Sequence, residues 1–138
     1  MPTDPTYRPD PLRSVFRWLL ALFFVLAGAN HFRRPEIYLS MMPPWVPWPG
    51  FVSAVCGACE ILGGAALFLP ATRTAAGWCL IALLVAVLPA NLHVALMGRM
   101  PGYDFSPAVL WIRLPFQLVL IAWAAWVAFP NARDKRWE

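Results

Sequence analysis

Four long apolar segments constrain this chain more than any other feature of its sequence. They run from about Ser14 to His31, Phe51 to Leu69, Thr74 to Met97 and Val109 to Phe129. Each has about 18 to 24 residues, and a helix that rises about 1.5 Å per residue then crosses a hydrocarbon core of about 30 Å. Unpaired backbone groups cannot face lipid, so such segments must be helical. The sequence therefore predicts an all-α integral membrane four-helix bundle.

The composition supports one membrane domain. The chain has 138 residues, of which 60% are hydrophobic and 13% are charged, whereas a soluble domain has roughly 25% charged residues. We expect a disordered cytoplasmic arm (1–13), a four-helix transmembrane domain (14–130) and a basic cytoplasmic tail (131–138). The arm lacks the apolar run of a signal peptide. The net charge of +4 does not indicate a nucleic-acid partner, because the basic residues cluster at segment ends.

The arginines and lysines predict an orientation. Seven of the eleven lie in the arm, in the first turn of the segment after it, in the second loop and in the tail, three lie in the first and third loops, and Arg113 lies deeper inside a segment. Positive residues favour the cytoplasmic side, so we expect both termini in the cytoplasm and the protein in a cell inner membrane. The first loop, residues 33–50, would then lie outside. Its five prolines and its Tyr38, Trp45 and Trp48 suit either an interfacial anchor or a lid over a pocket.

Polar side chains interrupt the apolar segments, where ionisable groups are costly and normally face a bundle interior or a cavity. Under the expected orientation all of them fall in the outer half. The set comprises His31, Glu60, Asn91, His93, Arg113 and Gln117. Arg113 and Gln117 are four residues apart and share a helix face. This one-sided distribution predicts a polar pocket that opens outward and is closed below by apolar side chains.

Glu60 and Arg113 have two interpretations. They form a structural ion pair between two helices, or Glu60 is a catalytic group. His31 and His93 suit hydrogen bonding better than ligation of a metal or a haem, because no Cys or Asp pattern accompanies them. We therefore expect no metal site.

Two prolines lie inside the apolar segments. Pro89 and Pro115 are each expected to bend their helix and to free a carbonyl one turn earlier. Asn91 is placed to satisfy the carbonyl that Pro89 frees.

Cys56 and Cys59 have the C-x-x-C spacing within the second segment. This spacing is a redox motif when it lies at an exposed helix start near a positive charge. Residues three apart share a helix face, so both thiols could line the pocket beside Glu60. Alternatively, they are small packing residues at a close helix crossing, which the glycines of the same segment favour. We prefer the packing interpretation.

Several motifs together resemble the DoxX-like membrane proteins. In chain order they are GANHF, the proline-rich loop, EILGG, PANLH and RLPFQ, and the likeness runs from about Val15 to Ala128. The resemblance implies a compact four-helix membrane bundle associated with redox processes, including quinone-linked sulfur oxidation by relatives. It carries over Asn30, His31, Pro35, Tyr38, Pro43, Pro44, Glu60, Asn91, His93, Arg113 and Gln117. The chain departs from the family pattern at Cys56 and Cys59, where small residues are expected.

Three functions are compatible with the sequence, and catalysis is left open. The first is a redox-associated membrane protein that binds a small amphipathic molecule, with a quinone as the candidate cofactor and a redox protein as a partner. His31, His93, Arg113 and Gln117 would donate to the quinone, and Glu60 would relay protons. The second is an accessory or scaffold subunit whose polar cluster is structural. The third is a transporter, which the lack of an inverted repeat disfavours.

Overall fold

The computed structural model describes residues 10–129, which form five helices and no extended strand. They are α1 (Pro11–Arg33), α2 (Pro35–Leu39), α3 (Pro49–Ala66), α4 (Arg73–Met97) and α5 (Pro107–Ala128). All but α2 are long and apolar enough to cross a membrane, and many of their large apolar side chains are exposed. The predicted all-α four-helix bundle is therefore confirmed, and the chain is a multi-pass membrane protein in contact with lipid.

The first helix begins earlier than predicted. α1 starts at Pro11, so the expectation that the arm is disordered up to residue 13 is wrong. Asp10 caps the helix, and its carboxylate accepts a hydrogen bond of 3.0 Å from the Leu12 N–H. Proline suits the first turn because its missing N–H would have no partner there. Residues 1–9 of the expected arm and the expected tail (131–138) lie outside the described residues.

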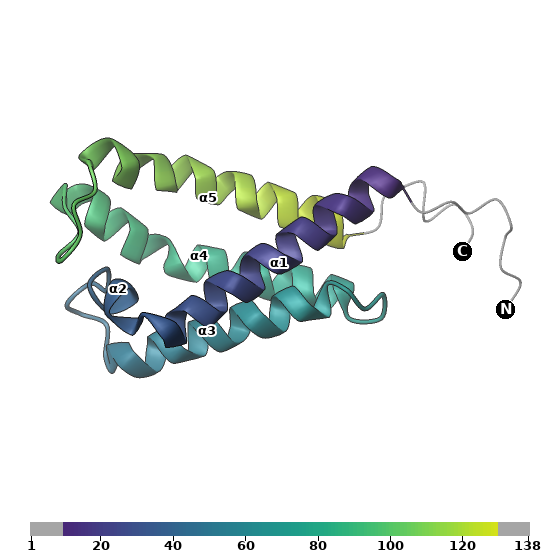
Figure 1. Ribbon diagram of the computed structural model, residues 1–138, viewed down its shortest axis with the longest axis horizontal. Helices are drawn as coiled ribbons and strands as arrows, with labels where there is room; N and C mark the ends of the chain where they lie inside the picture. The colour runs from purple at the N-terminus through teal and green to yellow at the C-terminus, as the bar shows by residue number, and fades with distance from the viewer. Residues whose placement is uncertain (1–9, 130–138) are drawn as a thin grey trace, which may run out of the picture.

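The four spanning helices associate as two pairs. α1 packs along α3, α4 packs along α5, and the contact between α3 and α4 joins the pairs. Figure 1 shows that α1 and α5 lie together where α1 begins and α5 ends, and that they diverge toward the other end. We call that other end, which carries α2, the α2 end.

Two glycines set the close crossing of α1 and α3. A Cβ added to Gly28 would lie 2.5 Å from the carbonyl oxygen of Gly57, and a Cβ added to Gly57 would lie 2.6 Å from the Cβ of His31. Small residues allow membrane helices to approach at this distance. The crossing therefore determines how far His31 lies from the side chains of α3.

Two arginines join α1 to the last turn of α5. The Arg13 side chain donates from Nε to the Trp126 carbonyl at 2.9 Å, and it also bonds the Phe129 carbonyl. Arg17 Nε donates to the Val127 carbonyl at 3.0 Å. The last carbonyls of a helix lack intrahelical donors, and arginine supplies several N–H groups. These bonds fasten the bundle at the end opposite α2.

Two apolar cores lie toward the two ends of the bundle. The larger one fills the half where α1 begins, and its fully buried side chains include Leu20, Phe24 and Leu80. The smaller one packs the segment after α2 against the neighbouring ends of α4 and α5, through Met41, Val94, Ala95, Met100 and Leu110. The structure thus has a solid half and a half in which polar residues meet.

Candidate functional site

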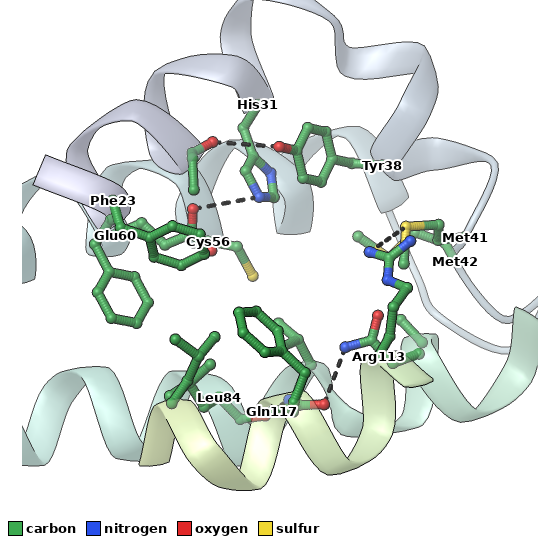
Figure 2. A pocket seen from close by; sticks show the side chains of 17 residues that line it. Phe23, His31, Tyr38, Met41, Met42, Cys56, Glu60, Leu84, Arg113 and Gln117 are labelled. Carbon is green, nitrogen blue, oxygen red and sulfur yellow. Dashed lines mark hydrogen bonds and ion pairs between the residues drawn. The ribbon is translucent and has the colours of Figure 1, made fainter. Parts of the chain in front are cut away.

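A cavity of about 350 Å³ lies between the two helix pairs, in the half nearer α2 (Figure 2). Every spanning helix contributes to its wall. Its polar lining consists of His31, Tyr38, Glu60, Asn91, Arg113 and Gln117. Eight residues are predicted from the sequence to bind a ligand: Asn30, His31, Tyr38, Glu60, Asn91, His93, Arg113 and Gln117. Six of them surround one cavity, in a bundle whose helix pairs diverge at that point. Their role in binding stays a prediction.

Glu60 and His31 face each other where α1 crosses α3. The Glu60 Oε2 atom lies 3.7 Å from His31 Nε2, while His31 Nδ1 lies 3.0 Å from the Ser53 hydroxyl. With Nδ1 accepting the hydroxyl hydrogen, Nε2 carries a proton toward the carboxylate. Glu60 Oε2 is buried and accepts no hydrogen bond from the described residues. A buried oxygen in this state is normally satisfied by water or by a bound molecule.

Arg113 lies on a different wall of the cavity. Its Nη2 contacts the Met41 sulfur at 3.5 Å, a weak acceptor for a guanidinium that has five N–H donors. Among the residues that the structure describes, Arg113 has no carboxylate partner, and Figure 2 shows its side chain apart from Glu60. The predicted Glu60–Arg113 ion pair is therefore wrong. α5 diverges from α1 and α3 at this depth, which leaves His31 as the ionisable side chain that faces Glu60.

Gln117 and Asn91 connect α5 to α4. Asn91 Nδ2 donates to Gln117 Oε1 at 3.0 Å, and Gln117 Nε2 donates to the Leu84 carbonyl. Asn91 was expected to satisfy the carbonyl freed by Pro89, but its side-chain amide donates to Gln117 instead. Both α4 and α5 continue through their internal prolines as single helices, and the bends expected there stay a prediction.

Tyr38 covers the cavity from α2. Its ring stacks on His31 with 3.4 Å between the ring centroids. Its hydroxyl donates to the Ala27 carbonyl at 3.3 Å and accepts from Asn30 Nδ2 at 3.1 Å. Burial raises the pKa of Tyr38, so the phenol stays neutral. Asn30 does not line the cavity; it holds Tyr38 in place.

The first loop thus acts as a cover through Tyr38, Met41 and Met42, which line the cavity. Trp45 and Trp48 do not line it, and they are 69% and 78% exposed. The loop was expected to act as an anchor or as a lid. The contacts that cover the cavity come from α2 and the residues after it. The role of the indoles as interfacial anchors stays a prediction.

Besides Asn30, two of the predicted site residues do not line the cavity. His93 is two residues beyond Asn91, a rotation of about 200° around a helix, so Asn91 faces the cavity and His93 does not. Cys59 is rotated away from Cys56, which lines the cavity, and lies beside Cys79 of α4. The alternative in which both thiols line the pocket is therefore wrong, and the preferred packing interpretation stays a prediction. Within residues 10–129, no three His, Cys, Asp or Glu side chains lie close enough to hold a metal.

The sequence did not point to Ser53 and Met41. Ser53 is 2% exposed and bonds His31; its position seven residues before Glu60, two turns on the same face, was an available signal. Met41 comes from the loop, where periodicity gives no direction for a side chain.

The sequence profile of a domain of unknown function, DUF8561, matches residues 20–128. The chain belongs to the DUF8561 family. No curated protein and no solved structure matches it. The matched range contains every residue of the cavity lining, so the site lies wholly within the DUF8561 domain.

Proposed function

We propose that this protein binds a small amphipathic molecule of the bilayer in the cavity, with a quinone as the first candidate. The observation that carries the proposal is a pair of unmatched groups on one cavity. Glu60 Oε2 accepts no hydrogen bond from the described residues, and within residues 10–129 the polar partner of Arg113 is the Met41 thioether. A buried polar group without a partner costs about 1–3 kcal/mol, and a charged group costs more. A ligand that offers a donor and an acceptor would offset both costs.

A quinol has the required chemistry beside an ionised Glu60, and a quinone has it beside a protonated Glu60, whose hydroxyl can donate to a quinone carbonyl. The two oxygens of either molecule lie on opposite sides of a flat ring, so one oxygen can accept from Arg113 while the other faces Glu60. In the reduced form that second oxygen carries a hydrogen, which the carboxylate can accept. His31 and Ser53 continue from Glu60 as a row of groups with exchangeable protons. The electrons would pass to or from a redox partner protein.

Two observations from the sequence support the wider role. The motifs that resemble DoxX-like proteins favour an association with membrane redox processes. The excess of arginine and lysine in the arm, the second loop and the tail favours an inner membrane with both termini in the cytoplasm. The cavity would then lie in the outer half of the bilayer, in reach of partners on that side.

A second candidate is a scaffold subunit whose polar cluster only joins helices. The Asn91–Gln117–Leu84 chain favours it, because these groups satisfy one another across α4 and α5. The open cavity and the unmatched Glu60 and Arg113 favour the binding role. A scaffold would need neither an open cavity nor unmatched polar groups on its wall.

The test uses the full chain in nanodiscs. Lipid extraction followed by mass spectrometry identifies molecules that copurify, and thermal melting with decylubiquinone and a short-chain menaquinone measures binding. We expect both quinones to raise the melting temperature of the wild type, and to raise it less for Arg113→Gln and Glu60→Leu. His93→Ala is the matched control and should respond as the wild type does. No shift with either quinone, and no copurifying amphipathic molecule, would establish the scaffold role instead.

A further inference from the structure

We infer that the cavity opens sideways into the bilayer between α1 and α5, and that the apolar tail of its ligand lies in this opening. We call the opening the lateral portal and define it by Phe23 on α1 and Phe116 on α5. The inference rests on the proposed function, since it concerns how an amphipathic molecule would reach the cavity and lie in it.

Close helix contacts narrow the other sides of the cavity. α1 and α3 touch through Gly28 and Gly57, where a single added Cβ has no room. α4 and α5 are joined by the Gln117 side chain, which bonds the Leu84 carbonyl and Asn91. α3 and α4 meet next to the larger core, where a Cβ on Gly63 would lie 2.7 Å from the Leu80 side chain. None of the cavity-lining residues of α3 and α4 is exposed, so that side of the cavity does not reach the lipid-facing surface through an exposed side chain.

The two ends of the cavity are covered. Toward the α2 end, Tyr38 stacks on His31 and Met41 packs in the smaller core against α4 and α5. Toward the opposite end, Phe24 and Leu120 line the cavity and also belong to the larger core. A molecule in the cavity therefore meets packed protein above and below.

The side between α1 and α5 differs. The ring contacts between these helices lie at the end opposite α2, where Phe16 meets Trp123 and Trp126 with centroids 5.7 and 5.5 Å apart. From there the helices diverge (Figure 1). Phe23 is 41% exposed and Phe116 is 49% exposed, yet both line the cavity. A side chain that belongs both to the lipid-facing surface and to the cavity wall marks the place where the cavity reaches that surface.

The size of the cavity defines the class of ligand. A volume of about 350 Å³ is at the lower end of the range of about 300–1,000 Å³ for small-molecule pockets. It accommodates a polar ring, and a long chain would have to lie outside it. The portal flanked by two phenylalanines offers such a chain an apolar path. The ligand is thus a lipid-phase molecule with a compact polar head and one apolar chain.

Photolabelling in vesicles of phosphatidylcholine tests the portal. The probe is a benzoquinone whose alkyl chain carries a diazirine close to the ring, and excess decylubiquinone serves as competitor. We expect competitor-sensitive label on α1 and α5, in the peptides that contain Phe23 and Phe116. Competitor-sensitive label on the lipid-facing sides of α3 or α4 would overturn the portal and leave quinone binding in place. No competitor-sensitive label, together with no thermal shift, would overturn the proposed function and the portal with it.

Variants that narrow the portal give a second readout. Phe23→Trp and Phe116→Trp should each slow competitor-sensitive labelling several-fold while leaving the melting temperature of the free protein nearly unchanged, because both side chains face lipid in part. Leu22→Trp is the control, since Leu22 is 53% exposed on the same helix but does not line the cavity. Equal labelling rates for the wild type and both Phe variants would contradict entry by this route.

Discussion

His31 and Glu60 lie on opposite sides of the α1–α3 crossing, with 3.7 Å between Nε2 and Oε2. The close approach of the backbones at Gly28 and Gly57 brings them together. The Glu60 carboxylate therefore faces His31 on α1, and Arg113 on α5 faces the cavity.

The two candidate partners of Glu60 can be distinguished by double-mutant cycles. We expect Glu60→Leu and His31→Leu to be coupled by about 0.5–3 kcal/mol, the usual range for contacting residues, while Glu60→Leu and Arg113→Leu come closer to additive. Unfolding in detergent monitored by circular dichroism gives the free energies. Stronger coupling of Glu60 to Arg113 than to His31 would restore the ion pair that the sequence predicted.

The α1–α3 crossing has its own test. Gly28→Ala and Gly57→Ala should each lower the free energy of unfolding by about 1–3 kcal/mol, the usual cost of overpacking, because the added Cβ meets atoms at 2.5 and 2.6 Å. Gly50→Ala is the matched control, as nothing lies within 4 Å of its Cβ. If all three variants melt together, the glycines are not what holds the helices at this distance.

The cysteines should differ in reactivity. Cys56 lines the cavity and Cys59 does not, so a bound quinone should slow alkylation of Cys56 by N-ethylmaleimide and leave Cys59 unaffected. Tryptic mass spectrometry of protein labelled with and without decylubiquinone measures both sites. Cys59→Ala should leave quinone-induced thermal shifts unchanged. Equal protection at both thiols, or loss of the shift in Cys59→Ala, would support the redox interpretation of the pair.

Tyr38 should make stability fall at high pH. Its pKa is raised by burial above the ordinary value of 10.0, so the folded state holds this proton more tightly than the unfolded chain does. The contribution is fully present below about pH 10 and is lost as the pH rises through the raised value. Tyr38→Phe keeps the ring against His31 and removes the ionisation, so its stability should decline less steeply across this range. Parallel declines for the two proteins would show that folding does not raise the pKa of the phenol.

The sequence alone determined the number and nature of the spanning helices. Apolar segments of this length can satisfy their backbone groups in lipid only as helices, and that requirement does not depend on how the helices pack. The cost of polar groups in hydrocarbon likewise pointed to a shared cavity for Glu60, Asn91, Arg113 and Gln117 before any packing was known.

Only the tertiary structure decided which side chains meet. The rotation of α4 about its axis points Asn91 into the cavity and His93 away from it. The rotation of α3 places Cys56 at the cavity and Cys59 outside it. The partner of Glu60 depends on the distances between helices. The glycine contacts bring α1 close to α3, and α5 diverges from α1, so Glu60 faces His31. A helical pattern states which residues share a face, whereas the angle and separation of two helices follow from side chains packed along their whole length.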